Sequence, residues 1–271
     1  MTTSGVTTVG VLTPHAAAGA EAEFARMAPA RVRTKVARIR PGAGDGEPPT
    51  SAEGLRALAT PAAIDEAASA LFPGSVEVLA YASTSSGYAI GYDAESALLQ
   101  RLRERWIVPA CAPSWSAVSA LRSRHIERIS VVHPPWFGDS LNRLGAGYFH
   151  GQGFEVVEAH LAELPDDPDV IEPAMVVEWV SRHVSRRAEA VFIGGNGFRA
   201  AEAVDRLEDR LGRPVLEANQ VLLWSVLRSA GVPAQSEGFG VLFDRWLPEG
   251  PAAESGRQGV SRGSQPGTAR R

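Results

Sequence analysis

Short apolar runs alternate with amphipathic segments along almost the whole chain, and this alternation restricts the fold more than any other feature. We expect strands at residues 9–12, 76–81, 107–110 and 190–193, and a helix-like segment follows each of them. Strands joined through a helix pair in parallel, because a helical crossover returns the chain to the same end of the sheet. The sequence therefore predicts an α/β protein whose mostly parallel sheets are flanked by helices.

The same order of elements occurs twice, which indicates two pseudo-symmetric lobes. The motif Val9-Gly-Val-Leu-Thr-Pro14 matches Ile129-Ser-Val-Val-His-Pro134 in this repeat. A single duplication predicts two similar lobes with a ligand cleft between them, not a solenoid of many units. We assign residues 1–117 to an N-terminal α/β lobe, completed by residues 225–247, and residues 118–224 to a C-terminal α/β lobe. Residues 248–271 contain almost no large apolar side chain and are predicted to form a disordered tail.

Two strands, one in each lobe, end in turns of small and polar residues. Residues 83–86 follow the strand at 76–81, and residues 194–197 follow the strand at 190–193. Such a turn points backbone N–H groups beyond the strand end, where an anion binds them. We therefore assign substrate-binding roles to Thr84, Ser85 and Ser86 of the first turn and to Gly195, Asn196 and Gly197 of the second turn.

Each turn also has a purely structural interpretation. The hydroxyls of the first turn would cap a helix that begins near Gly91. The glycines of the second turn would only permit a positive φ in a tight turn. Their spacing does not fit the dinucleotide-binding fingerprint, so this stretch alone is weak evidence for a ligand.

Composition and charge exclude several functional classes. The chain has 271 residues and a net charge of −4, with scattered basic residues, so we expect no nucleic-acid partner. A single cysteine, Cys111, excludes an intramolecular disulfide and a multi-thiolate metal site. No apolar run approaches membrane-spanning length, and the N-terminus lacks the pattern of a signal peptide. We expect a cytoplasmic protein with no membrane partner.

Four segments resemble the maleate isomerase and arylmalonate decarboxylase branch of the aspartate/glutamate racemase superfamily. They are residues 10–14, 81–86, 191–199 and 219–224, and they occur in the family's order. The resemblance extends over roughly residues 6–231. It implies two lobes with the substrate between them, no organic cofactor and no metal. It also implies that backbone amides and hydroxyls of the post-strand turns hold the substrate carboxylates.

The chain departs from the family pattern at the residues that carry its chemistry. The family uses cysteines in the two turns, two in racemases and maleate isomerases and one in the decarboxylases. The matching positions here are Ser83 and Gly195. An expected Asn after the first strand is replaced within residues 16–18. An expected Tyr after the fifth strand is absent, although Trp136 or Phe137 would fill its space. The resemblance supports carboxylate recognition and argues against thiolate catalysis.

Without the cysteines, histidine is the best acid or base. His133 and His15 follow strands whose carboxyl ends are expected to face the cleft, and a neutral imidazole transfers protons near pH 7. Alternatively, His133 only orders the turn at residues 134–135. Ser83 becomes a nucleophile only beside a histidine and otherwise binds substrate. We name His133, His15 and Ser83 as catalytic candidates, and no histidines have metal-ligand spacing.

Five further residues have expected roles. Thr13 and Trp136 are assigned to substrate binding, with Trp136 as an apolar wall. Cys111 is expected to be a buried core residue. Arg199 would either neutralise a second carboxylate or lie on the surface. Asn219 would either cap a helix or form a structural hydrogen bond near the site.

Taken together, these features predict a cofactor-independent isomerase, racemase or decarboxylase that acts on a small carboxylate or dicarboxylate with a non-cysteine acid or base. The alternative is a non-catalytic carboxylate-binding protein that kept the pocket and lost the chemistry. A third hypothesis is acyl chemistry through Ser83. A homo-oligomer is compatible with this architecture, but the sequence indicates no particular interface.

Overall fold

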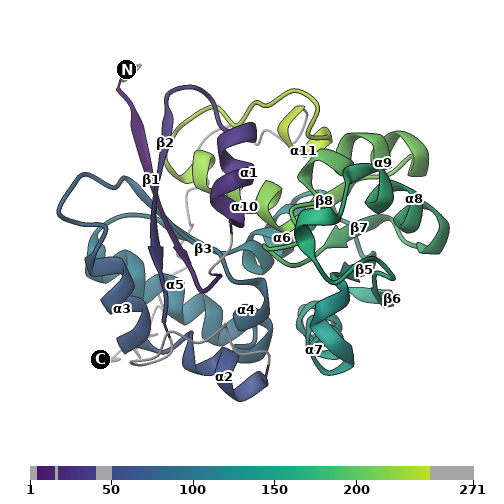
Figure 1. Ribbon diagram of the computed structural model, residues 1–271, viewed down its shortest axis with the longest axis horizontal. Helices are drawn as coiled ribbons and strands as arrows, with labels where there is room; N and C mark the ends of the chain where they lie inside the picture. Colours follow the sequence, from purple (N-terminus) through teal and green to yellow (C-terminus); the bar gives the residue numbers. More distant parts are fainter. Residues whose placement is uncertain (1–4, 16–17, 41–50, 245–271) are drawn as a thin grey trace, which may run out of the picture.

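The computed structural model describes residues 5–15, 18–40 and 51–244 and contains two four-stranded parallel sheets (Figure 1). The strand orders are β2-β1-β3-β4 and β6-β5-β7-β8, so both sheets have the same topology. The predicted α/β fold with two pseudo-symmetric lobes is therefore confirmed. The first sheet consists of β1 (Thr7–Thr13), β2 (Val32–Arg38), β3 (Val78–Tyr81) and β4 (Ala110–Cys111). The second consists of β5 (Arg128–His133), β6 (Glu155–Leu161), β7 (Ala190–Ile193) and β8 (Val215–Glu217).

Helices follow the strands and cover the sheets. Those of the first half are α1 (Ala20–Met27), α2 (Ala52–Ala57), α3 (Pro61–Ser69), α4 (Thr84–Ile90), α5 (Tyr92–Trp106) and α6 (Pro113–Ser123). Those of the second half are α7 (Gly138–His150), α8 (Pro173–His183), α9 (Val204–Leu211), α10 (Ala218–Ser229) and α11 (Val241–Asp244). Three 3₁₀ turns are η1 (Pro135–Phe137), η2 (Pro168–Val170) and η3 (Ala201–Ala203).

Local capping chemistry sets several helix starts. The Thr60 side chain accepts a hydrogen bond from the amide of Ala63, and Pro61 occupies the first helical position, where its fixed φ favours the helix. At α10, however, the N-cap is Glu217 and not Asn219. The Glu217 carboxylate accepts from the amides of Asn219 and Gln220, each at 2.8 Å. The Asn219 side chain is thereby free for other contacts.

Two expected elements differ in the structure. The strand expected at residues 107–110 begins only at Ala110, because α5 extends to Trp106 and Ile107 adopts a left-handed conformation with φ of 57°. The helix expected near Gly91 is preceded by another, α4, which begins at Thr84. Threonine, serine and glycine are poor helix formers, so propensity alone does not indicate α4. Its burial between the lobes stabilises it.

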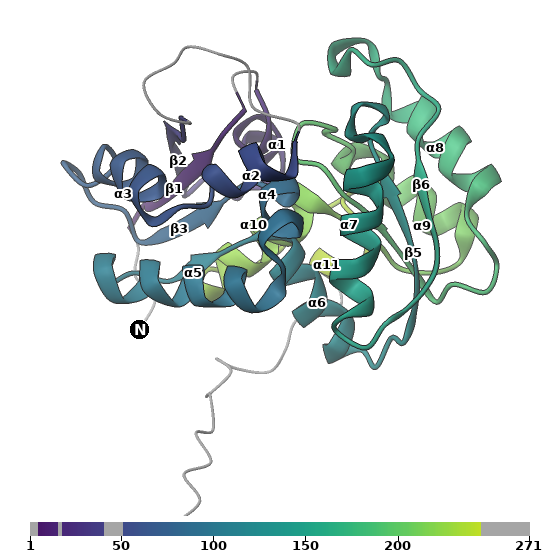
Figure 2. The same ribbon diagram turned by 90° about the horizontal axis from the view of Figure 1, so that it is seen from below.

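One apolar core is shared by both lobes. It joins Val11 and Leu79 of the first sheet with Val131 and Phe192 of the second. Figure 2 shows α4 and α7 between the two sheets, and these helices contact each other. A second, smaller core lies under α8 and α9. The lobes are therefore packed together through apolar side chains at the face where the strand ends meet.

The first sheet is drawn from residues 7–111 and the second from residues 128–217, after which α10 returns to pack on α6 and β3. The division at residues 117/118 and 224/225 stays a prediction. The tail predicted at residues 248–271 lies outside the described residues, as does part of the stretch at residues 16–18. Among the helices that the structure describes, none is long and apolar enough to cross a lipid bilayer.

Candidate active site

The two post-strand turns meet face to face, although 112 residues separate them in the chain. Thr84, at the end of β3, donates both its amide and its hydroxyl hydrogen to the Asn196 carboxamide oxygen, each at 2.8 Å. Both side chains are buried, with exposed fractions of 1%. Because the strands of each sheet are parallel, their carboxyl ends lie at one edge, and the structure brings those two edges together.

The first turn is largely satisfied by its own groups. Ser83 caps α4: its hydroxyl donates to the Ser86 hydroxyl at 2.8 Å and accepts from the Ser86 amide at 3.4 Å. Ser85 is 8% exposed. Within the described residues no histidine, lysine or carboxylate is hydrogen-bonded to Ser83, so no group there activates it as a nucleophile.

The second turn depends on glycine at two positions. Gly195 has φ of +100°, and a Cβ there would come within 2.9 Å of the Pro134 ring. A Cβ on Gly194 would lie 2.8 Å from the His133 ring. Among the described residues, no acceptor pairs with the amides of Gly195, Asn196 and Gly197. Buried N–H groups without an internal acceptor are rare, and they are the groups that a bound carboxylate uses.

A buried network extends from the second turn to a carboxylate. The Asn196 side-chain amide donates to Asn219 Oδ1 at 2.7 Å, and the Asn219 amide donates to Glu23 Oε2 at 2.5 Å. The other Glu23 oxygen accepts from the amide of Ala201 at 2.8 Å. Burial raises the pKa of Glu23 to about 7. Of the two roles expected for Asn219, the structure supports the hydrogen bond near the site.

His133 is buried beneath the second turn, in contact with both lobes. Its Nδ1 lies 2.7 Å from Asn142 Oδ1, and Asn142 donates its own amide to the carbonyl of Ala159. That contact fixes Oδ1 as the acceptor, so Nδ1 carries the proton. Nε2 then accepts from the Tyr88 hydroxyl at 3.1 Å. Burial lowers the pKa of His133 to about 4, so the ring is neutral at pH 7.

The two residues expected near the end of β1 differ in their surroundings. Thr13 is fully buried, and the adjacent Leu12 carbonyl accepts from the Ala82 amide, so Thr13 lies where β3 leads into the first turn. His15 donates its backbone amide to Thr13 Oγ1 at 3.3 Å. Burial lowers the pKa of the His15 side chain, and the nearby charges are Glu21 and Arg38. Among the described residues, the His15 side chain has no hydrogen bond to either turn.

Aromatic side chains after β5 flank the second turn. A Cβ on Gly197 would lie 3.9 Å from Trp136, which packs edge-on against Phe198. Phe137 stacks on the His133 ring with a centroid separation of 5.3 Å. Trp136 thus lies beside Gly197, and its expected role as an apolar wall for a ligand stays a prediction.

Cys111 and Arg199 form no hydrogen bond with the two turns among the described residues. Cys111 is buried, burial raises the pKa of its thiol, and its sulfur lies 3.5 Å from the Ser229 hydroxyl. It is the core residue that was expected. Arg199 forms an ion pair with Asp169 at 2.5 Å.

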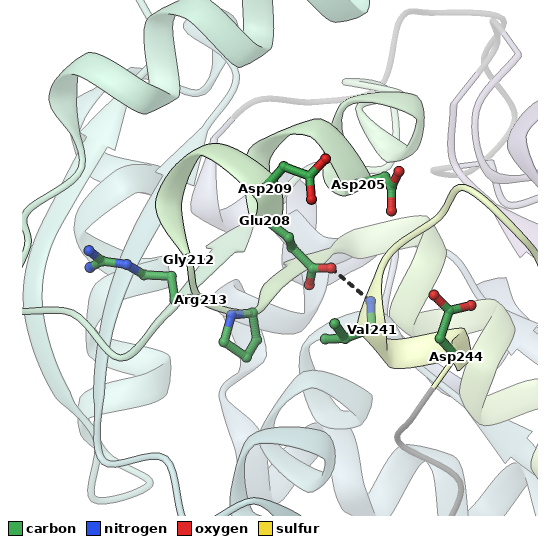
Figure 3. A pocket seen from close by; sticks show the side chains of 8 residues that line it. Asp205, Glu208, Asp209, Gly212, Arg213, Val241 and Asp244 are labelled. Atoms are coloured by element: carbon green, nitrogen blue, oxygen red, sulfur yellow. Dashed lines mark hydrogen bonds between the residues drawn. The ribbon is translucent and has the colours of Figure 1, made fainter.

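Two surface cavities lie away from the turns. The one in Figure 3, of about 370 Å³, lies between α9 and α11 and is lined by Asp205, Glu208 and Asp244 among others. Glu208 accepts from the Val241 amide there, which joins the start of α11 to α9. The other, of about 400 Å³, lies on α8 beside Trp179. Among the described residues, no cluster of histidine, cysteine and carboxylate side chains is placed to hold a metal.

Sequence reasoning missed the partners of the site residues. Tyr88 and Asn142 hold His133, and Glu23 anchors Asn219. Tyr88 follows the first turn by a few residues, and Asn142 and Glu23 lie in ordinary amphipathic helices. The packing of the two lobes brings Tyr88 to His133 and Glu23 to Asn219, and the packing of α7 on β5 and β6 brings Asn142 to His133, so no local pattern indicates these partners.

Comparison with known proteins agrees with this fold. The family model for arylmalonate decarboxylase matches residues 53–243. The arylmalonate decarboxylase of Bordetella bronchiseptica is 24% identical over 250 residues, which cover 88% of this chain and 96% of that protein. The maleate isomerase of Alcaligenes faecalis is 24% identical over 195 residues, 69% of this chain and 76% of that protein. The crystal structure of the maleate isomerase Iso from Pseudomonas putida S16 superposes with a TM-score of 0.78 at 21% identity, covering 89% of this chain and 99% of that one.

Proposed function

Because the chain belongs to the arylmalonate decarboxylase family, we propose that it is a cofactor-independent isomerase, racemase or decarboxylase of a small carboxylic acid. The observation that carries this proposal is the row of amides at Gly195, Asn196 and Gly197, which have no acceptor among the described residues. They lie at the end of β7, where the turns of the two lobes meet.

The chemistry follows from where negative charge develops. Removing a proton or carbon dioxide from the carbon next to a carboxylate moves an electron pair onto the carboxylate oxygens. Backbone donors that are already in position stabilise that charge without reorganising. The aromatic side chains of Trp136 and Phe137 beside the turn favour a substrate whose remaining part is apolar.

We assign the proton transfer to the pair Tyr88 and His133. The Tyr88 hydroxyl lies near Gly194, since a Cβ on that residue would be 2.9 Å from it. As the Tyr88 oxygen takes a proton from the substrate carbon, its own proton passes to the neutral His133 Nε2, to which it is already hydrogen-bonded. The reverse transfer returns a proton to the carbon. Asn142 keeps the ring in the required tautomer.

The test uses proton NMR in D2O with maleate, methylmalonate, phenylmalonate, aspartate and glutamate. We expect the wild type to isomerise, decarboxylate or deuterate one of them. Tyr88→Phe keeps the ring but removes the hydroxyl, so it should lower turnover by about 10²-fold or more. Tyr92→Phe, a matched control four residues away on the next helix, should retain activity. His133→Ala should abolish turnover while the circular dichroism spectrum stays native. Full activity of both Tyr88→Phe and His133→Ala would show that these two residues do not transfer the proton.

One observation favours a second candidate function, carboxylate binding without turnover. The two positions that match the family's cysteines are Ser83 and Gly195, and the Ser83 hydroxyl is hydrogen-bonded to Ser86. A binding protein would show a higher melting temperature with a ligand that remains chemically unchanged. Thermal stabilisation without any product in D2O would therefore favour this function over the enzyme.

A further inference from the structure

Thr84 already holds an oxygen in the way that it would hold a carboxylate. Its amide and its hydroxyl both donate to Asn196 Oδ1, each at 2.8 Å. A carboxylate oxygen is commonly bound in this way, by two hydrogen-bond donors that converge on it. The oxygen here belongs to the protein itself, so these donors are not available to a ligand.

Further hydrogen bonds hold the Asn196 carboxamide in place through its nitrogen atom. Its nitrogen donates to Asn219, which in turn donates to Glu23 Oε2 at 2.5 Å and to the Asn196 carbonyl at 2.9 Å. The bonds from Thr84 to Asn196, from Asn196 to Asn219 and from Asn219 to Glu23 run in one direction, and such aligned bonds strengthen one another. All four side chains are buried. Moving Asn196 aside would leave several buried polar groups without partners, which costs more than one carboxylate contact returns.

The remaining groups suit one carboxylate. The amides at residues 195–197 are the larger set of donors without an acceptor among the described residues, and Trp136 and Phe137 add apolar surface beside them. In the first turn only Ser85 has an amide and a hydroxyl without a partner among those residues, so that turn keeps one free amide where the second keeps three. Neither Arg199 nor His133 offers a second anchor: Arg199 is paired with Asp169, and the neutral His133 ring has both nitrogens hydrogen-bonded.

We propose that Asn196 takes the place of a second substrate carboxylate at Thr84, so that this site selects a ligand with one carboxylate and an apolar remainder. The inference rests on the proposed function and gives it a substrate class. Asn196 acts as a specificity-determining residue, and Asn219 and Glu23 are positioning residues that act through it.

The experiment measures dissociation constants by calorimetry at pH 7.5 for two matched ligand pairs. Maleate and isocrotonate differ only by a carboxylate in place of a methyl group, and phenylmalonate and phenylacetate differ by one carboxylate. The wild type should bind each monocarboxylate at least as tightly as its dicarboxylate partner. Asn196→Ala frees the Thr84 donors and should shift the preference at least tenfold toward the dicarboxylates. If the alanine variant does not fold, the dissociation constants of Asn196→Ser are measured instead, and the same shift toward the dicarboxylates is expected.

Gln220→Ala is the matched control. It also removes a buried carboxamide, one that donates to the Phe239 carbonyl and has no bond to Thr84, so the ligand preference should not change. A wild type that prefers the dicarboxylates tenfold, or Asn196 variants that bind with an unchanged preference, would overturn the inference and leave the proposed function standing. If neither the wild type nor the Asn196 variants bind any of the four acids, the proposed function fails and this inference fails with it.

Discussion

The two post-strand turns occupy equivalent places in the two lobes, yet their donors are used differently. In the first turn, Thr84 is hydrogen-bonded to Asn196, and Ser86 to Ser83. In the second, the amides of residues 195–197 have no acceptor within the described part of the chain. Duplication of the fold therefore has not produced two copies of one site. Most donors of the first turn bond within the protein, whereas three amides of the second have no acceptor among the described residues, and it is there that we propose a ligand binds.

The groups beneath the two turns differ as well. Gly87 of α4 lies against the Glu95 carboxyl, which accepts from the Tyr148 hydroxyl, whereas Gly194 lies against the His133 ring. Burial raises the pKa of Glu95 to about 7 and lowers that of His133 to about 4. Near neutral pH the His133 ring beside the second turn therefore stays neutral, whereas the Glu95 carboxyl beside Gly87, just after the first turn, gains and loses its proton.

The largest expected effect comes from adding a side chain to the second turn. Gly195→Ala forces an alanine into a φ of +100° and places its Cβ within 2.9 Å of Pro134. We expect a loss of about 2–4 kcal/mol in the free energy of unfolding, together with loss of ligand binding. Urea denaturation and calorimetry measure the two effects.

The control is Ser83→Ala, at the equivalent place in the first turn. It removes only the side-chain cap of α4, so the expected loss is about 1 kcal/mol. If Ser83→Ala weakens ligand binding as much as Gly195→Ala does, the two turns are used alike and the comparison is wrong.

A smaller effect concerns pH. Because the folded-state pKa of Glu95 is raised from 4.5 to about 7, the folded protein holds this proton while the unfolded chain has released it. The stability that the protonated carboxyl provides is complete below about pH 4.5 and is lost as the pH rises through 7. Glu95→Gln does not titrate. Its stability relative to the wild type should therefore rise by about 1–3 kcal/mol between pH 5 and pH 8.

Glu104→Gln on the same helix, α5, is the matched control, because Glu104 is exposed and, within the described residues, its carboxylate accepts a hydrogen bond from Gln100 alone. Its stability difference from the wild type should not change over this pH range. His133 works in the opposite sense, since a depressed histidine pKa makes stability rise between about pH 4 and pH 6.5. A pH-independent difference for Glu95→Gln would show that Glu95 is ionised in the folded protein already at pH 5.

The sequence predicts the fold well, because the signals for it are local. Apolar runs and capping residues indicate the strands and most helices, and the repeated motifs indicate two lobes. Turn chemistry also identifies residues 83–86 and 194–197. The helix α4 escapes prediction because Thr84-Ser-Ser-Gly has low helix propensity, and only the surrounding core stabilises it.

The pairings within the site escape prediction for a different reason. Thr84 and Asn196 are identified separately as ligand contacts, but nothing in the sequence indicates that they bind each other across 112 residues. The same holds for Tyr88 and His133, which belong to different lobes. Such contacts depend on the angle between the lobes, and periodicity and turn signals carry no information about that angle.

The most direct test of this account is a crystal structure of the wild type with phenylacetate. We predict that the carboxylate accepts from the amides at residues 195–197, with the phenyl ring beside Trp136 and the Thr84–Asn196 hydrogen bonds intact. A carboxylate bound to Thr84, with the Asn196 side chain rotated away, would contradict the claim that the first turn is filled by the protein itself.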